Sequence, residues 1–348
     1  MNEPITTREN KMRVRRGLLM TVSALALCGA ASRAGAAEDG HPTVWIELGG
    51  QFAQEQADQD AYLPSFLATS PFVTPASSLE KNSRASLDGT AKVTFETDNG
   101  WVFSAAVRYG KTSRDKTVNH QTAHGSATYD GQPAGAYDAY QLFRAKASGS
   151  HTVLDFQAGK DVGLGSIGSS VLSAGVRFAQ FNSRTNVEIQ SQPTNINSSG
   201  FYHIFRAKFN AARSFNGVGP SVSWNASTNL FGNPASSSIA LDWGVNAALL
   251  FGRQRVNEEH QTTDNYKHGV HYLSITSARG GAPRNKNVTV PNLGGFAGVS
   301  WQAPGAKVTF GYRADFFFSA MDGGIDKSKS ENVGFYGPFV AVSVGIGG

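Results

Sequence analysis

Apolar and polar residues alternate along most of this chain. The clearest run is AKVTFGYRADFFF at 306–318, where one parity is apolar and the other carries Lys307, Arg313 and Asp315. Successive side chains of a β-strand point to opposite faces, so all three charges fall on one face of a strand. Helical periodicity is almost absent after residue 36. The pattern therefore predicts an all-β protein.

The same alternation predicts about ten strands. Most of the runs are longer than the roughly 5–6 residues of an ordinary soluble strand, and their length suits strands tilted across a bilayer. The sixth run is too long for one span and contains SFNGVGP, which can form a turn, so eight and twelve strands stay open. The predicted strands are 43–54, 85–96, 100–110, 150–159, 170–181, 201–226, 238–252, 288–302, 306–319 and 334–347.

Short and long connections follow one another along the chain. ETDNGW at 96–101 and WQAPGAK at 301–307 have the composition of tight turns. Long polar segments, which we expect to be loops, lie near 55–84, 111–150, 183–200, 253–287 and 320–333. Short turns at one end and long loops at the other are typical of outer-membrane barrels. We therefore predict a transmembrane antiparallel up-and-down β-barrel over 37–348, with short periplasmic turns and long extracellular loops.

The polar parity of the strands is expected to line the lumen of this barrel. A charge facing lipid at mid-depth would cost roughly 2–4 kcal/mol, so charged side chains should point inward. Aromatic residues near strand ends fit interfacial girdles: Trp101, Tyr109, Trp243, Trp301 and Tyr312. The predicted lumen-lining residues are Glu47, Lys92, Arg108, Asp155, Arg177, Arg206, Lys208, Asp242, Lys307, Arg313 and Asp315.

This charged lining has two interpretations. Its seven basic and four acidic groups favour a polar pore with a mild preference for anions. A barrel of about ten strands has little free bore, however, so the same groups could form a salt-bridge network that plugs the lumen. The sequence leaves both interpretations open.

The first 36 residues are expected to be a cleaved signal peptide. A basic segment ends at Arg16, the apolar stretch GLLMTVSALALCGAA follows, and small residues at Ala34 and Ala36 suit a signal peptidase. The single cysteine, Cys28, lies in this leader. Four of the five net positive charges also lie there, so the remaining chain is nearly neutral. A nearly neutral chain offers no basic surface for binding nucleic acid.

A glycine motif within the chain imitates a dinucleotide-binding fingerprint. Gly163, Gly165 and Gly168 follow an apolar run, and Glu188 lies twenty residues further on. That fold needs a helix after the glycines, whereas SVLSAGVRFAQF has the period of a strand. We interpret the glycines as a periplasmic connection, place Glu188 in a loop, and expect no cofactor.

Neither metal binding nor catalysis is expected. His268 and His271 are the best pair for a metal, but no carboxylate or cysteine spacing supports a site. Ser150 and His151 are neighbours on a strand and cannot form part of a catalytic triad. The histidines expected in the long loops are His120, His124, His260, His268 and His271. The chain is thus not expected to be an enzyme.

Several strand motifs resemble one known family. WIELGGQF, GWVFSAAVRYG, LDFQAGKDVGLG followed by AGVRFAQF, LDWGVNAALLFGRQ and GPFVAVSVG are similar to the pore-forming outer-membrane proteins grouped with the Legionella major outer membrane protein. The resemblance implies a barrel that forms a pore. One departure is the end of the chain, which is Gly347 and Gly348 instead of an aromatic residue.

The expected function is that of a porin-like channel in the outer membrane of a Gram-negative bacterium, passing small polar solutes or ions. The alternative is a non-conducting surface barrel whose long loops bind partners or stabilise the envelope. Its expected surroundings are outer-membrane lipid and lipopolysaccharide, with no nucleic-acid partner. The sequence leaves a homo-oligomer open.

Overall fold

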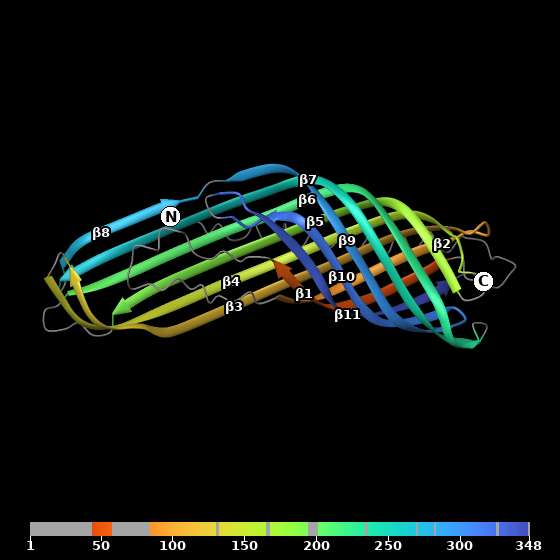
Figure 1. Cartoon of the computed structure of the whole chain (residues 1–348), viewed down its shortest axis with the longest axis horizontal. Coiled ribbons are helices and arrows are strands. Elements are labelled where there is room, and N and C mark those ends of the chain that lie inside the picture. The colour runs from red at the N-terminus through yellow and green to blue at the C-terminus, as the bar shows by residue number, and fades with distance from the viewer. Residues whose placement is uncertain are drawn as a thin grey trace, which may run out of the picture.

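A computed structural model describes residues 44–57, 84–129, 132–164, 168–193, 201–233, 236–268, 271–281, 283–324 and 327–346. The expected signal peptide and most of the segment 55–84 lie outside these residues. Every regular element described is a β-strand (Figure 1). The strands are β1 Val44–Ala57, β2 Arg84–Glu96, β3 Trp101–Tyr129, β4 Gln132–Asp161, β5 Gly168–Pro193, β6 Phe201–Asn233, β7 Ser237–His268, β8 His271–Gly280, β9 Arg284–Ala303, β10 Ala306–Asp322 and β11 Ser330–Ile346.

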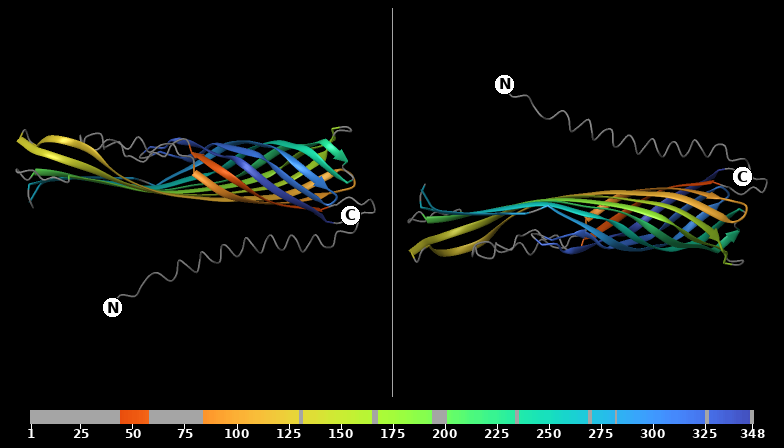
Figure 2. Two further views of the ribbon diagram at one scale, coloured as in Figure 1. Left: turned by 90° about the horizontal axis from the view of Figure 1, so that it is seen from below. Right: turned by 90° about the horizontal axis from the view of Figure 1, so that it is seen from above.

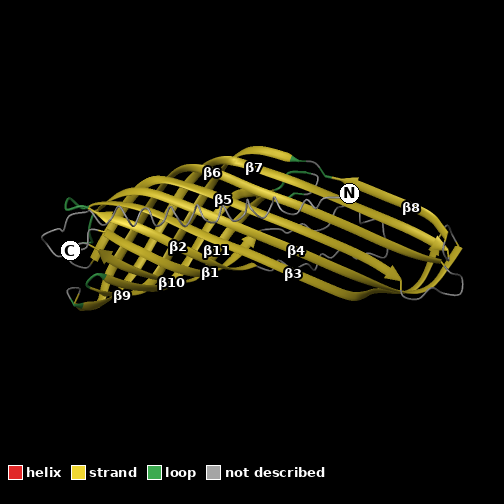
Figure 3. Ribbon diagram, turned by 180° about the vertical axis from the view of Figure 1, so that it is seen from behind, coloured by secondary structure: helices red, strands yellow, loops and turns green. Residues whose placement is uncertain are grey.

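Ten of these strands close into a barrel. Each pairs antiparallel with its neighbours in the order β1-β2-β3-β4-β5-β6-β7-β9-β10-β11, and β11 returns to pair with β1 (Figure 3). Val44 lies opposite Ile346, so the first and last strands meet at the end that carries the short turns. Among the described strands, β8 stands outside the ring and pairs only with β7. The predicted antiparallel barrel of about ten strands is therefore confirmed.

The long sixth run is a single strand, with no turn at SFNGVGP. Gly217 and Gly219 stay in the ladder between β5 and β6. A Cβ on Gly219 would lie 1.9 Å from the carbonyl oxygen of Leu249 on β7. The glycine thus permits a close approach of two strands, which is a common reason for glycine inside a sheet.

Two of the expected long loops, 111–150 and 253–287, are mostly strands instead, and the described part of a third, 183–193, continues β5, so those predictions were wrong. Past the barrel, β3 and β4 stay paired as far as Tyr129 and Gln132, and β5, β6, β7 and β8 extend in the same way. Together they form a curved sheet that projects from one end of the barrel (Figure 2). His120 and His124 lie in β3, His260 and His268 in β7, His271 in β8 and Glu188 in β5. The outer faces of these segments are polar, and backbone pairing still orders them.

The opposite end carries the short connections. Tight turns follow β2 and β9, with Gly100 (φ 73°) and Gly305 (φ 72°) in the left-handed conformation that glycine tolerates. Gly163 (φ 68°) lies in the β4–β5 connection, and Gly168 begins β5 directly. Gly165 is outside the described residues. Since a strand follows the motif, it has no helix N-terminus to receive a pyrophosphate.

An apolar band encircles the outside of the barrel, and a separate apolar core fills part of the inside. On β10 the outward residues Phe310 and Tyr312 are exposed, whereas Phe317 on the other parity is completely buried. Of the predicted girdle residues, Trp101, Tyr109, Trp301 and Tyr312 are exposed on this outer face, while Trp243 is half-buried against Trp224. The described residues contain no helix long and apolar enough to span a membrane.

Candidate functional site: the lumen of the barrel

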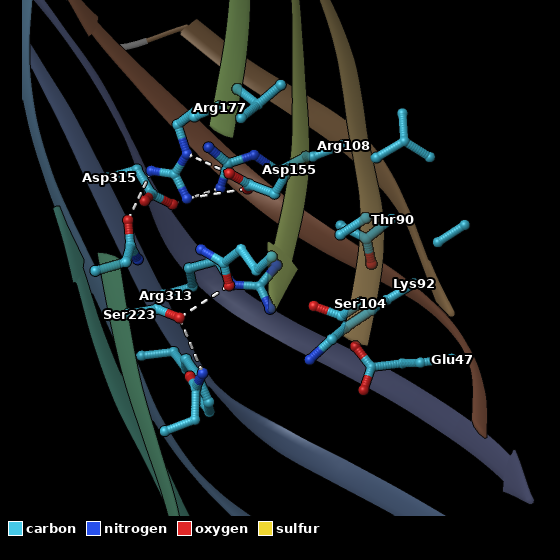
Figure 4. Close-up of a pocket in the computed structure, with 18 of the residues that line it drawn as sticks. Glu47, Thr90, Lys92, Ser104, Arg108, Asp155, Arg177, Ser223, Arg313 and Asp315 are labelled. Atoms are coloured by element: carbon cyan, nitrogen blue, oxygen red, sulfur yellow. Dashed lines mark hydrogen bonds and ion pairs between the residues drawn. The ribbon is translucent and has the colours of Figure 1, made fainter. Parts of the chain in front are cut away.

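A cavity of about 150 Å³, lined in part by charged side chains, lies inside the barrel. Its wall comes from β1, β2, β3, β4, β5, β6, β7, β9 and β10, so it belongs to the lumen and not to a surface groove (Figure 4). Seven of the residues predicted to line the lumen surround it: Glu47, Lys92, Arg108, Asp155, Arg177, Arg313 and Asp315.

One ion pair crosses the lumen. Arg108 on β3 donates to Asp315 on β10 at 2.5 Å, and both side chains are less than a tenth exposed. Around the ring these strands are four steps apart, so the pair joins distant parts of the wall. Breaking such a buried pair by removing one partner typically costs about 3–5 kcal/mol.

Arg177 holds a second group of lumen side chains. Its guanidinium makes a bidentate contact with Asp155 on β4, at 2.7 and 3.0 Å. The same guanidinium donates to Asn246 on β7 at 2.7 Å and to Asn292 on β9. One arginine on β5 therefore connects three other strands, and its charge is fully compensated.

Arg313 differs from these two arginines. Within the described part of the chain no carboxylate lies at ion-pair distance from it, although it points into the cavity (Figure 4). Its guanidinium instead lies over the rings of Phe339 and Phe296, with 4.8 and 5.8 Å to the centroids. Cation–π contacts of this kind stabilise a cation but do not neutralise it. Arg313 thus offers positive charge to whatever occupies the cavity.

Two more predicted residues point inward outside the cavity wall. Lys307 on β10 forms an ion pair with the buried Asp242 on β7 at 2.8 Å. Both belong to the inward parity of their strands, near the end with the short turns.

Arg206 and Lys208 do not line the lumen, and that prediction was wrong. Both are exposed, whereas Ala207 and Phe209 between and beside them are buried. Lys208 reaches Glu188 on the outer face of β5 at 3.8 Å. In the barrel the apolar parity of a strand faces lipid, but in the extension it faces the inside of the curved sheet. Along β6 the apolar parity therefore changes sides, and parity counted from apolar residues assigned these two to the wrong face.

The lumen also contains a buried Asp–His pair that was not predicted from the sequence. Asp88 accepts from Ser86 at 2.5 Å and lies 2.8 Å from Nε2 of His151. Asp88 has the same parity as Lys92 on the predicted strand 85–96, so the alternation could have found it. Although Ser, Asp and His are the residue types of a catalytic triad, here the carboxylate lies between the other two. The imidazole does not contact the Ser86 hydroxyl in this arrangement and cannot activate it.

An aromatic layer lies next to this pair and extends across the lumen. The ring of Phe181 is 4.7 Å from that of Phe317 and 5.8 Å from that of Phe335, and Phe335 in turn is 3.9 Å from the ring of His151. Strands β5 and β11 are five steps apart in either direction, so Phe181 and Phe335 reach each other from opposite walls. The layer, named here by its fully buried rings, consists of Phe181, Phe215, Phe317 and Phe335, with Val153, Leu250 and Val290 around them.

Further charged groups face inward where the barrel meets the extension. Arg284 on β9 contacts both Glu258 on β7 and Asp322 at the end of β10. Among the described residues no group of three His, Cys, Asp or Glu side chains is placed to hold a metal. His268 and His271 are register partners where β7 meets β8.

The closed ring, its outward apolar band and its charged interior define a transmembrane β-barrel of the outer-membrane class. More specifically, the chain belongs to the family described as Legionella pneumophila major outer membrane protein precursor, whose model matches residues 65–346. This confirms the resemblance found in the strand motifs. No curated protein matches the chain.

Solved outer-membrane barrels show only distant similarity. The translocator domain of the autotransporter NalP from Neisseria meningitidis is 10% identical, with 97% of this chain and 98% of that chain covered and a TM-score of 0.25. The transport unit of the autotransporter AIDA-I from Escherichia coli is 4% identical, with 89% and 92% covered and a TM-score of 0.27. The P. putida toluene transporter TodX is 8% identical, with 90% and 91% covered and a TM-score of 0.20. Values this low transfer no ligand or activity to this chain.

Proposed function

We propose that this protein is a porin-like channel for ions or small polar solutes, and that the conformation described is closed. The observation that carries the proposal is the order of layers along the lumen. A charged cavity ends at an aromatic layer that reaches from one wall to the other. Hydrophobic constrictions of this kind gate channels by excluding water.

The chemistry of the cavity supports a path for solutes. Filling the lumen with apolar residues would avoid the desolvation of buried charges, which is often neutral or stabilising. The chain instead keeps Arg313 without a carboxylate partner in the described residues, beside polar Ser223 and Asn225. An uncompensated cation in a cavity of about 150 Å³ is useful for contact with a passing anion or water and has no use in a sealed core.

The test removes the aromatic layer. We would record currents across planar bilayers for the wild type, Phe181→Ala, Phe317→Ala and the double variant. The wild type should be mostly closed, whereas the double variant should show discrete, long-lived steps. Phe251→Ala is the matched control, because Phe251 is an exposed phenylalanine on the outer face and its loss should leave the currents as in the wild type.

Correct folding is checked separately, since truncating a buried phenylalanine typically costs about 3–5 kcal/mol. Folded barrels migrate differently from heated ones on detergent gels, and all variants should retain that difference. A folded double variant that stays silent would overturn the channel proposal.

The second candidate is a non-conducting surface barrel. It is favoured by the buried Arg108–Asp315 pair and the Arg177 network, which also span the lumen. Under this hypothesis the extended sheet beyond the barrel would bind partners or stabilise the envelope. Silence of every folded variant, together with loss of a binding activity when the extension is shortened, would support it. Both candidates are non-enzymatic, in keeping with the arrangement of Ser86, Asp88 and His151.

A further inference from the structure

The outer wall changes character abruptly on β5, β6, β7 and β9. Phe178, Val218 and Phe251 are register neighbours across three strands and form the last apolar row. The next two rows on the same outer face are wholly polar. They consist of Gln180, Asn216, Arg253 and Asn287, followed by Asn182, Ser214, Arg255 and Asn285.

Three arginines follow this border without acidic neighbours: Arg253 and Arg255 lie in the two polar rows, and Arg184 lies in the row after them. Arg184, Arg253 and Arg255 are exposed on the outer face, and none forms an ion pair within the described part of the chain. The outward carboxylates Glu188 and Glu259 lie four residues further along the same strands and pair with Lys208 and Arg279. We call Arg184, Arg253 and Arg255 the arginine patch.

The spacing within the patch suits more than one anionic group. Arg253 and Arg255 point the same way from β7, about 7 Å apart along the strand. Arg184 lies on β5, two strands or about 10 Å across the sheet. Its row contains Ala212 and Asn257, so it is also displaced along the strands by about 7 Å from Arg255 and about 13 Å from Arg253. Arginine binds phosphate through two parallel hydrogen bonds. Further donors are the amides of Asn182, two residues before Arg184 on β5, and of Asn216, the register partner of Arg253.

We propose that the arginine patch binds the phosphates of lipopolysaccharide in the outer leaflet. The acyl chains of this glycolipid would lie along the apolar wall formed by Phe178, Val218 and Phe251. A soluble acidic partner would have no need of lipid-facing residues directly beside the cations. The inference depends on the outer-membrane location of the barrel and is independent of whether the lumen conducts.

The experiment measures binding of purified lipopolysaccharide and of its enzymatically dephosphorylated form to the full chain in uncharged detergent micelles. The wild type should bind the phosphorylated form at least about tenfold more tightly, since a few charge-assisted hydrogen bonds exceed the 1.4 kcal/mol that this ratio requires. Equal binding of the two forms would overturn the proposal without any variant.

The variant R184Q/R253Q/R255Q should lose this preference. R144Q/R206Q/K208Q is the matched control, because it removes the same charge from exposed outward positions further along the extension. The control should keep the preference. If both variants lose it equally, the effect is general electrostatics and the patch is not a site. Gel mobility and bilayer currents should be unchanged in both variants, which separates failure here from failure of the channel proposal.

Discussion

At the scale of single residues, a buried carboxylate of this barrel is stabilised by several hydrogen-bond donors at once. Asp322 lies at the far end of β10, beyond the apolar band, and accepts from the backbone N–H groups of Lys329 at 2.9 Å and Gly324 at 3.0 Å. Arg284 donates to its other oxygen at 3.1 Å. Burial alone would raise the pKa of Asp322, but these donors outweigh it and hold the pKa below the ordinary 3.8.

Asp322→Asn should therefore destabilise the protein at neutral pH by about 1–3 kcal/mol, the range for hydrogen bonds to a charged group. Because the folded pKa is depressed, this stabilisation is present above the unfolded value of 3.8 and is lost as the pH falls through the folded pKa. Urea unfolding in micelles at pH 7 and pH 3 measures it. The difference between wild type and variant should shrink at the lower pH.

Asp115→Asn is the control for this change. Asp115 pairs with Lys146 at 3.3 Å on the exposed outer face, so its loss should cost less than about 1 kcal/mol. Equal losses for the two variants would show that the donors around Asp322 contribute nothing specific.

The sequence predicts which residues face inward only where lipid defines the outside. Parity placed Arg108, Arg177 and Asp315 on the polar face of strands whose other face is apolar, and the structure points them inward. The same argument failed for Arg206 and Lys208 because the apolar parity there faces the curved sheet. The contacts between lumen residues were also not predictable from the sequence. The Arg108–Asp315 ion pair, for example, depends on which strands face each other across the closed ring.

At the scale of strands, the main difference from expectation is length. The barrel parts of β3 to β7 were predictable from an apolar face that looks outward. In their extensions the outer face is polar and the apolar residues face the inside of the sheet, and composition marked most of these segments as loops. Backbone pairing continues regardless of side-chain type, as the register from Lys111 to Tyr129 on β3 shows. Segments that composition marks as loops can therefore be ordered sheet.

The position of this extended sheet predicts which residues a reagent added outside the cell can reach. The mature chain is expected to have no cysteine, so single cysteines can be introduced without background. Asn186→Cys on the outer face of β5 should react with a membrane-impermeant maleimide on intact cells, because the extension lies beyond the apolar band. Val222→Cys should stay unlabelled, because Val222 lies within that band.

Asn99→Cys tests the opposite end of the barrel. Asn99 lies in the short turn between β2 and β3, so it should react only after the outer membrane is permeabilised. Labelling of Asn99→Cys on intact cells would contradict the predicted orientation, in which the short turns face the periplasm.

At the scale of the whole molecule, the closed ring brings together charges that no local pattern connects. The sequence alone suggested a surplus of basic groups in the lumen. The structure removes Arg206 and Lys208 from the lumen and adds Asp88 and Glu55, among others. In the described part of the lumen and its mouth, the bases are Lys92, Arg108, Arg177, Arg213, Arg284, Lys286, Lys307 and Arg313, and the acids are Glu47, Glu55, Asp88, Asp155, Asp242, Glu258, Asp315, Asp322 and Glu331.

This balance predicts an ion preference opposite to the one expected from the sequence. With more acidic than basic groups along the path, the opened variant F181A/F317A should show a weak preference for cations, because charged linings set channel selectivity. In a tenfold gradient of potassium chloride, its reversal potential should take the sign of cation flow and stay well inside the limit of about 59 mV for a perfectly selective pore. Adding Arg313→Gln should move the potential further in that direction, since it removes a lumen cation without a carboxylate partner among the described residues. Arg253→Gln, on the outer face, should leave it unchanged. A reversal potential of the opposite sign would show that charges other than these lumen side chains set the ion selectivity.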